Sequence, residues 1–491
     1  MGNKKKQIFF FIRTSIVFLW CCMMTILISR ELKKRPFIDL DERYDNINIA
    51  EQEQWYGIYL NNKKIGYSQS FIKRVEEGYH IQEKLFLDMS IMESPQQVHV
   101  QLNTVTDSNL MLRIFSFRLT SGALHFIVYG SLEGTTLKMV IDTIGGIKKK
   151  ELQLKRPLVM ATNLKYAVLK QGLATGRDFT KDIFDPVTMD FRTIMVHIGE
   201  KEKVILNGKT YLCYKIKQCF DNIDVYGWID EKGSLIKEES PTGFVMIQEE
   251  KHAAQNAGWA ERVDILATTA IKPDKPIQKE GLSFLQIRLK NIPSSNGYML
   301  SDGRQKKIGD CITIELEDVE KHHTFTLPYS GTDMMEYLQP EQFIVPNDDM
   351  IQKTVRDILG NTTDAQHAVR LLNTWVYNNI EKRPTISIPD ARTVLSTRQG
   401  DCNEHAVLLA ALCRAAGIPA RVCAGLVYMR GNFYYHAWNE VYLSAWITID
   451  PSLHQFPADV THIKCIHGPL QRHAMLLKLI GKLAIEVVAY R

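Results

Sequence analysis

The strongest constraint on the fold is a cysteine at a predicted helix start, followed by a predicted three-stranded meander. Cys402 follows a loop that contains Gly400, and it opens an alanine- and leucine-rich run with high helical preference. Strand-like segments follow at 421–429, 433–443 and 446–450. We therefore expect a helix packed on an antiparallel sheet in this part of the chain, and an α+β fold overall.

Each part of this pattern carries a side chain suited to nucleophilic catalysis. Cys402 lies in the first turn of the predicted helix, where the helix dipole favours thiolate over thiol. His436 lies on the second strand, and Asp450 ends the third. A thiol, an imidazole that takes and returns its proton, and a carboxylate that orients the imidazole form an activated nucleophile. We predict that Cys402, His436 and Asp450 are catalytic.

The pairing of His436 with Asp450 depends on the turn between the second and third strands. A two-residue turn would place Asp450 opposite Asn439, on the face away from His436. A connection of three residues would instead place Asp450 opposite Trp438, and the imidazole and carboxylate would then share a face at diagonal spacing. The triad hypothesis therefore predicts the three-residue connection or a bulge.

Other polar residues near the pattern have simpler explanations. Glu404 and His405 share a helical turn with Cys402 and are expected to bond locally or to solvent. Glu440 lies four residues along the strand from His436, a separation of about 13 Å that prevents contact. Four more histidines could be imagined as the base, but none has as clear a strand context: His454, His462, His467 and His473.

A basic leader and a long apolar run indicate a membrane anchor at the amino terminus. Residues 8–29 are apolar except for Arg13 and four small hydroxyl residues. Twenty-two residues in a helix span about 33 Å, enough to cross a hydrocarbon core of roughly 30 Å. The run is long for a cleavable signal peptide, and no small-x-small cleavage site follows it. We expect residues 1–35 to be a cytoplasmic leader and an uncleaved transmembrane helix.

The charge distribution supports export rather than nucleic-acid binding. The net charge is +5, but residues 1–35 hold eight basic side chains and one acidic one, so the remainder carries −2. The body of the chain therefore lacks the excess positive charge that nucleic-acid binding needs.

Basic residues flank the apolar run on both sides, so the positive-inside rule barely decides its orientation. Because a short basic leader and one early anchor usually begin an exported domain, we expect the bulk to be periplasmic or otherwise extracytoplasmic.

Residues 50–265 are predicted to form an antiparallel β-rich domain. Short strands are joined by turns that contain asparagine or glycine. The strand pairs are 55–60 with 65–72, 204–206 with 210–216 around Asn207-Gly208, and 225–229 with 235–239 near Gly233. This pattern favours a half-barrel or a sandwich. The region is similar in general appearance to periplasmic β-domains, so we expect a binding or spacer module with a protein or lipid partner.

The remaining segments divide the chain further. Residues 255–280 have the proline- and lysine-containing composition of a linker, and 280–335 are expected to form a small β-subdomain or linker. Residues 340–491 form the predicted catalytic domain. In it, Asn347-Asp348-Asp349 can cap a helix that Gly360 ends, and Thr363 can cap a second helix. Of the nine cysteines, two lie in the anchor and no other two have C-x-x-C spacing, so neither a structural metal nor a cofactor is expected.

Three motifs in the catalytic region resemble those of the transglutaminase-like superfamily, whose core is related to papain-type cysteine peptidases. They are Gly400-Asp401-Cys402-Asn403-Glu404-His405-Ala406, Tyr435-His436-Ala437-Trp438-Asn439-Glu440-Val441-Tyr442, and Trp446-Ile447-Thr448-Ile449-Asp450-Pro451-Ser452. The similarity runs from about residue 347 to the end, and 455–464 is similar to bacterial, membrane-anchored members. The resemblance implies that Cys402 is the nucleophile, His436 the general base and acid, and Asp450 the orienting carboxylate.

These parts predict an amide-bond enzyme with a thioester intermediate. Cys402 would attack an amide carbonyl, and His436 would protonate the leaving amine. Water as the second acceptor gives a peptidase or amidase, and an amine gives protein–glutamine crosslinking. Because bacterial members of the superfamily are more often regarded as peptidases, we expect hydrolysis of exported protein or peptide. Transglutamination and a non-catalytic scaffold are the alternatives. Backbone amides near Cys402 are better candidate oxyanion donors than the Gln399 side chain.

Overall fold

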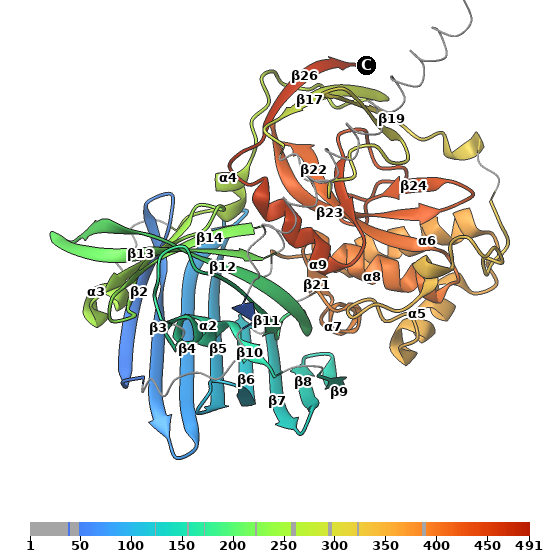
Figure 1. The fold of residues 1–491 in the computed structure, drawn as a ribbon. Coiled ribbons are helices and arrows are strands. Elements are labelled where there is room, and N and C mark those ends of the chain that lie inside the picture. The colour runs from blue at the N-terminus through green and yellow to red at the C-terminus, as the bar shows by residue number, and fades with distance from the viewer. Residues whose placement is uncertain are drawn as a thin grey trace, which may run out of the picture.

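The protein is α+β, with a large β-sheet followed by a region that contains helices (Figure 1). The computed structural model describes residues 38–39, 49–122, 124–154, 157–170, 172–220, 223–256, 262–292, 297–321, 324–384 and 389–491. The predicted anchor at 8–29 lies outside these residues. Within the described ranges, no helix combines the length and apolar character needed to span a bilayer.

One large, mainly antiparallel sheet occupies the first half of the described chain. Its strand order is β1-β11-β12-β13-β14-β15-β16-β2-β3-β4-β5-β6-β7-β8-β9, with β10 also paired to β11. The strands are β1 (Ile38–Asp39), β2 (Gln52–Leu60), β3 (Lys63–Val75), β4 (Gly78–Ile91), β5 (Ser94–Asp107), β6 (Leu112–Ser121), β7 (Leu124–Glu133), β8 (Thr136–Thr143), β9 (Gly146–Gln153), β10 (Val159–Met160), β11 (Asp178–Asp185), β12 (Asp190–Leu206), β13 (Lys209–Phe220), β14 (Ile223–Asp230), β15 (Leu235–Glu239) and β16 (Phe244–Glu249).

The three predicted hairpins are confirmed as β2 with β3, β12 with β13, and β14 with β15. Asn207 and Gly208 both have positive φ, 50° and 75°, as the tight turn between β12 and β13 requires. The pairing of β16 with β2 joins the two halves into one sheet. This single sheet agrees better with the predicted half-barrel than with the predicted sandwich of two sheets.

A short helix, α2 (Leu164–Lys170), fills the interior of this curved sheet. Tyr166 is fully buried and belongs to a core that it shares with Ile81 of β4 and with Ile183 and Ile216 from the other half of the sheet. Burial of one face of each half against the same helix provides the hydrophobic stabilisation that holds the curvature.

The helices of the C-terminal half begin close to the predicted residues. They are α5 (Asp349–Leu359), α6 (Ala365–Asn379), α7 (Ala391–Thr397) and α8 (Cys402–Ala415). Asp348 caps α5 and Gly360 ends it, as predicted. The predicted cap of α6 is wrong by one residue, because Asp364 rather than Thr363 accepts the His367 N–H, at 2.7 Å. A carboxylate also interacts favourably with the positive end of the helix.

Two four-stranded sheets complete the fold, and the predicted meander is confirmed in the first. Their orders are β24-β23-β22-β25 and β18-β19-β17-β26. The strands are β22 (Ala420–Met429), β23 (Asn432–Tyr442), β24 (Trp446–Ile449), β25 (Ile463–His467), β17 (Phe284–Lys290), β18 (Gln305–Ile308), β19 (Cys311–Glu315) and β26 (Ala484–Tyr490). The C-terminal strand β26 therefore joins the small subdomain (Figure 1). The predicted domain boundaries themselves stay predictions.

The meander contributes to two hydrophobic cores, one shared with the helices and one shared with the small sheet. Val422 and Val441 share one core with the helices, whereas Leu426 and Phe433 share another with the small sheet. The segment predicted as a linker contains α4 (Ile265–Thr269) and then pairs through Ile271 with Phe433, with both backbone hydrogen bonds at 2.8 Å. The linker is thus fixed to the catalytic region. Within the described residues, α3 (Lys251–Gln255) and α9 (Leu470–His473) are two further α-helices.

A buried ionic cluster ties the small sheet to the meander. Glu440, only 3% exposed, forms ion pairs with Arg421 and Lys464, and both of these cations also contact Asp302 at 2.7 and 2.8 Å. The two cations hold the pKa of Glu440 below its usual range although burial alone would raise it. Glu440 is therefore committed to this cluster and does not compete for His436.

We predict that Glu440→Gln strongly destabilises the fold. The substitution leaves two buried cations with one carboxylate, which should lower the free energy of unfolding by about 3–5 kcal/mol. Urea unfolding measures the change. Glu133→Gln is the matched control, because its pair with Lys138 is exposed to solvent and should contribute little to stability. Equal effects of the two substitutions would contradict the prediction.

Candidate active site

Cys402 begins α8 because the residues before it form a capping box. Asp401 accepts the Asn403 N–H at 2.8 Å, and Glu404 accepts the Asp401 N–H at 3.0 Å. Gly400 is required by close approach, since a Cβ there would lie 2.2 Å from the Glu404 Cβ. The local sequence thus fixes both the helix start and the position of the half-buried thiol.

The helix is fixed to the strand that carries His436. The Asn439 side chain on β23 donates to the Ala406 carbonyl of α8 at 2.8 Å. His405 is fully buried, and its Nδ1 donates to the Asp401 carbonyl at 2.7 Å, which agrees with the predicted local role. Burial lowers the pKa of His405. The thiol and the imidazole strand are therefore held in a fixed relation.

The predicted three-residue connection between β23 and β24 is confirmed. Tyr442 pairs with Trp446, and Asn439 pairs with Ile449. This register brings the imidazole and the carboxylate to the same side of the sheet. His436 Nε2 lies 2.6 Å from Asp450 Oδ2, and both side chains are buried.

The Asp450 carboxylate has hydrogen-bond donors on both oxygens. Its Oδ1 accepts the Ser452 N–H at 2.7 Å, the Ser452 hydroxyl at 2.8 Å and the Leu453 N–H at 2.9 Å. Its Oδ2 accepts from His436 and from His462. Although burial would raise the pKa of Asp450, these interactions hold it well below its usual range. Asp450 is therefore a permanent carboxylate that orients His436.

The backbone of β23 also reaches the thiol. The Ala437 N–H hydrogen bonds to the Cys402 sulfur and favours thiolate. Because His436 Nε2 is committed to Asp450, Nδ1 is the ring nitrogen that can exchange a proton with this sulfur. A thiol, an imidazole and a carboxylate bonded to that imidazole are the groups that an activated cysteine nucleophile would need.

The expected effect of the helix dipole on Cys402 is outweighed. Burial raises the pKa of the Cys402 thiol well above its usual value, and the carboxylates of Asp401 and Glu404 raise it further. Burial therefore works against a free thiolate at this position. A neighbouring base that takes the thiol proton would assist attack by the sulfur.

His462 also contacts Asp450, and no sequence pattern predicted this contact. His462 lies just before β25, and its Nε2 is 3.1 Å from Asp450 Oδ2. Of the other histidines considered, His467 contacts Arg421 at 3.0 Å, and His454 stacks on Tyr377. The three-residue spacing from Asp459 to His462 could have indicated a local ion pair, but nothing local indicates contact with Asp450.

Gln399 lies in β21 (Gln399–Gly400), which pairs with β20 (Glu381–Lys382) directly before the cysteine. Its side-chain oxygen accepts from Arg383 at 3.2 Å. The expectation that backbone amides near Cys402 are better oxyanion donors than this side chain stays a prediction. The pairing with β20 positions the loop that precedes Cys402.

His436, Asp450 and His462 are the one group in the described ranges whose side chains could be compared with a metal site, with ligand atoms within 4.8 Å of one another. A tetrahedral zinc would hold its ligand atoms about 3.3 Å apart. The 2.6 Å separation of His436 from Asp450 is shorter, as expected for a direct hydrogen bond. Hydrogen bonding explains this group, and we assign no metal to it.

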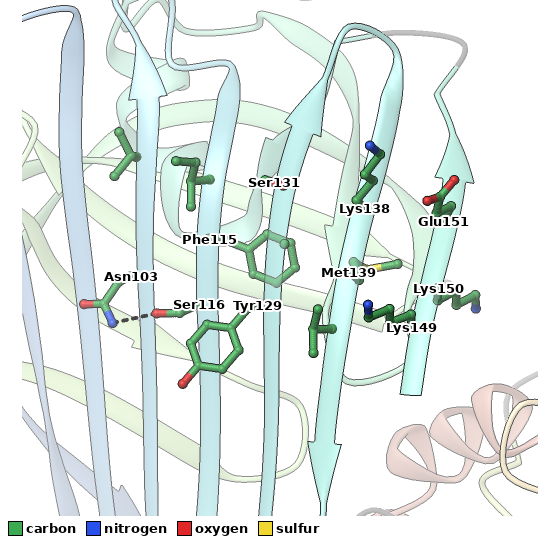
Figure 2. A pocket seen from close by; sticks show the side chains of 14 residues that line it. Asn103, Phe115, Ser116, Tyr129, Ser131, Lys138, Met139, Lys149, Lys150 and Glu151 are labelled. Carbon is green, nitrogen blue, oxygen red and sulfur yellow. Dashed lines mark hydrogen bonds between the residues drawn. The ribbon is translucent and has the colours of Figure 1, made fainter. Parts of the chain in front are cut away.

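A second concave feature lies on the large sheet, and no triad residue lines it. This hollow of about 540 Å³ is formed by residues of β5 to β9. Figure 2 shows Phe115 and Tyr129 near its centre, with Lys138 and Lys149 toward the edge strand. The protein or lipid partner predicted for the β-rich domain stays a prediction, because no described contact shows what covers this surface.

The family comparison agrees with the geometry. Residues 352–451 match the transglutaminase-like superfamily. This transglutaminase-like domain includes Cys402, His436 and Asp450, together with most of the helices and the meander. No curated protein sequence matches the chain.

Solved structures similar to the chain include two provisionally named proteases. One of them, named as a cysteine protease, comes from Cytophaga hutchinsonii and is 18% identical. The match covers 43% of this chain and 87% of that chain, with a TM-score of 0.30. The other, named as a protease, comes from Parabacteroides distasonis and is 10% identical. The match covers 66% of this chain and 64% of that chain, with a TM-score of 0.20. A β-barrel-like protein from Brucella abortus is 12% identical over 41% and 96%, with a TM-score of 0.33.

We predict that Asp401→Asn moves the alkylation of Cys402 to lower pH. Asparagine keeps the helix cap but removes a carboxylate that raises the pKa of the thiol. Iodoacetamide labelling followed by mass spectrometry measures the rate against pH, and thermal unfolding should change by less than about 0.5 kcal/mol. Asp401→Ala is the matched control, because it removes the same charge and also the cap, at a cost of about 1 kcal/mol. A profile that stays in place or moves upward would contradict the prediction.

Proposed function

We propose that the protein is a cysteine-dependent amide-bond enzyme that works through a thioester. The observation that carries this proposal is the buried His436–Asp450 hydrogen bond next to a cysteine at a helix start. The match of residues 352–451 to the transglutaminase-like superfamily supports it.

The proposed reaction uses these side chains in two half-reactions. The Cys402 sulfur bonds to an amide carbonyl carbon while His436 Nδ1 takes the thiol proton. His436 then gives that proton to the amine nitrogen as the carbon–nitrogen bond breaks. Water attacks the thioester while His436 takes a water proton; the carbon–sulfur bond then breaks, His436 returns that proton to the sulfur, and the carboxylic acid is released. Backbone N–H groups at the start of α8 are the proposed donors to the oxyanion.

We propose hydrolysis of an exported protein or peptide as the activity. The apolar run at 8–29 and its basic leader support a membrane-anchored enzyme with its catalytic domain outside the cytoplasm. Transfer to a protein amine is the second candidate, because the same thioester serves both acceptors and the family match does not choose between them. No cofactor takes part in the proposed chemistry.

We predict that Cys402 is the most reactive of the described thiols at neutral pH and that this depends on His436. His436→Ala should slow iodoacetamide labelling of Cys402 by roughly 10²-fold or more, since it removes the base. Mass spectrometry of each cysteine measures the rates. Cys311, which is also half-buried, is the internal control, and its rate should not change. The enzyme proposal fails if Cys402 reacts no faster than Cys311, or if its rate is unaffected by His436→Ala; a scaffold would behave in this way.

We predict that water is the preferred acceptor. A glutamine-containing protein is incubated with the enzyme and a labelled primary amine, with Cys402→Ala as the control. Cys402-dependent cleavage or deamidation should exceed amine incorporation, because hydrolysis needs no second binding site. Amine incorporation without hydrolysis would identify a crosslinking enzyme instead.

A further inference from the structure

His462 occupies a position that a simple triad does not contain. It is 1% exposed and its ring lies 5.9 Å from the His436 ring and 5.2 Å from the Trp438 ring, measured between centroids. Its Nε2 shares the same Asp450 oxygen that His436 contacts, at 3.1 and 2.6 Å respectively. Two imidazoles therefore converge on one carboxylate oxygen.

Both ring nitrogens of His462 face oxygen acceptors. Nε2 faces Asp450 Oδ2, while Nδ1 lies 3.1 Å from the Asp459 carbonyl and 3.3 Å from its carboxylate. A neutral imidazole would direct one nitrogen lone pair at an acceptor oxygen without a hydrogen between them. Because both nitrogens need a hydrogen to satisfy these contacts, the geometry is that of an imidazolium.

The surrounding charges balance such a cation. Asp459 also pairs with Lys279 at 2.8 Å, and its backbone carbonyl accepts from Arg304 at 2.8 Å. Lys279 and His462 together carry two positive charges against the two carboxylates of Asp450 and Asp459. His436 can consequently be neutral without leaving a buried carboxylate uncompensated.

We propose that His462 is a positioning residue, a permanently protonated imidazolium that neutralises Asp450 and keeps His436 available as a neutral base. This role rests on the proposed function of the Cys402 site. Without His462, His436 would be the only cationic or potentially cationic partner on the Asp450 Oδ2 atom. With His462 present, the His436 Nδ1 lone pair remains available for the thiol proton.

The electrostatic setting agrees with this assignment. Burial opposes the charged form of His462, but hydrogen bonds to Asp450 and Asp459 outweigh it, and the pKa of His462 is raised. The pKa of Asp459 is lowered, since its contacts with His462 and Lys279 outweigh its burial. Asp450 and Asp459 therefore both stabilise the charged form of His462.

The test is the pH profile of Cys402 alkylation in the detergent-solubilised full chain carrying His462→Gln. Glutamine can still donate to Asp450 but carries no charge. The apparent pKa values of the Cys402–His436 pair should rise by about one to two units, because one positive charge at about 6 Å is lost. Ser452→Ala is the matched control: it removes a neutral donor from the same carboxylate and should shift the profile much less. A purely structural role would lower the rate at every pH without moving the profile.

A second measurement needs no substitution and covers the case in which His462→Gln does not fold. Solid-state nitrogen NMR of the histidine-labelled full chain distinguishes imidazolium from neutral imidazole. At about pH 8.5, two units above the ordinary histidine pKa, an imidazolium signal should persist. Its absence would overturn the proposal, as would an unchanged or lowered pH profile in His462→Gln.

These outcomes are separate from those of the proposed function. If wild-type Cys402 is unreactive and independent of His436, the enzyme proposal fails first. If Cys402 is reactive and depends on His436 but His462→Gln leaves its pH profile in place, only the role of His462 fails.

Discussion

The buried Asp450 carboxylate is the constraint on which the rest of the catalytic region depends. A charge in this position is stable only with donors on both oxygens, and it receives them from Ser452, Leu453, His436 and His462. These donors come from a strand, a turn and the segment before another strand. The three segments must therefore fold together before the imidazole acquires a defined tautomer.

The small sheet contributes to the same constraint from outside the catalytic motif. Arg304 contacts the Asp459 backbone, and Glu317 accepts the Thr448 N–H at 2.9 Å beside the end of β24. The cluster of Asp302 with Arg421 makes a further link. Because β26 completes this sheet, the C-terminal end of the chain helps to support the site. The segment predicted as a small β-subdomain or linker is thus part of the structure that positions His436 and Asp450.

Features encoded by adjacent residues could be predicted well from the sequence. The Asn207-Gly208 turn, the Asp348 cap and the helix start at Cys402 each depend on hydrogen bonds within a few residues. The cap of α6 was missed by one residue, since neighbouring hydroxyl and carboxylate side chains give the same pattern. His462 was missed because its contact with Asp450 depends on the path of the chain between β24 and β25.

The sequence by itself determined the order of thiol, imidazole and carboxylate, and the helix and strands that carry them, since local hydrogen bonding and side-chain alternation define those elements. From the sequence, contact between His436 and Asp450 depended on the number of residues in the turn between their strands. Only the tertiary structure decided that length, brought His462 to the same carboxylate and buried the thiol enough to offset the helix dipole. Those outcomes depend on distances and desolvation between segments that the linear order of residues does not specify.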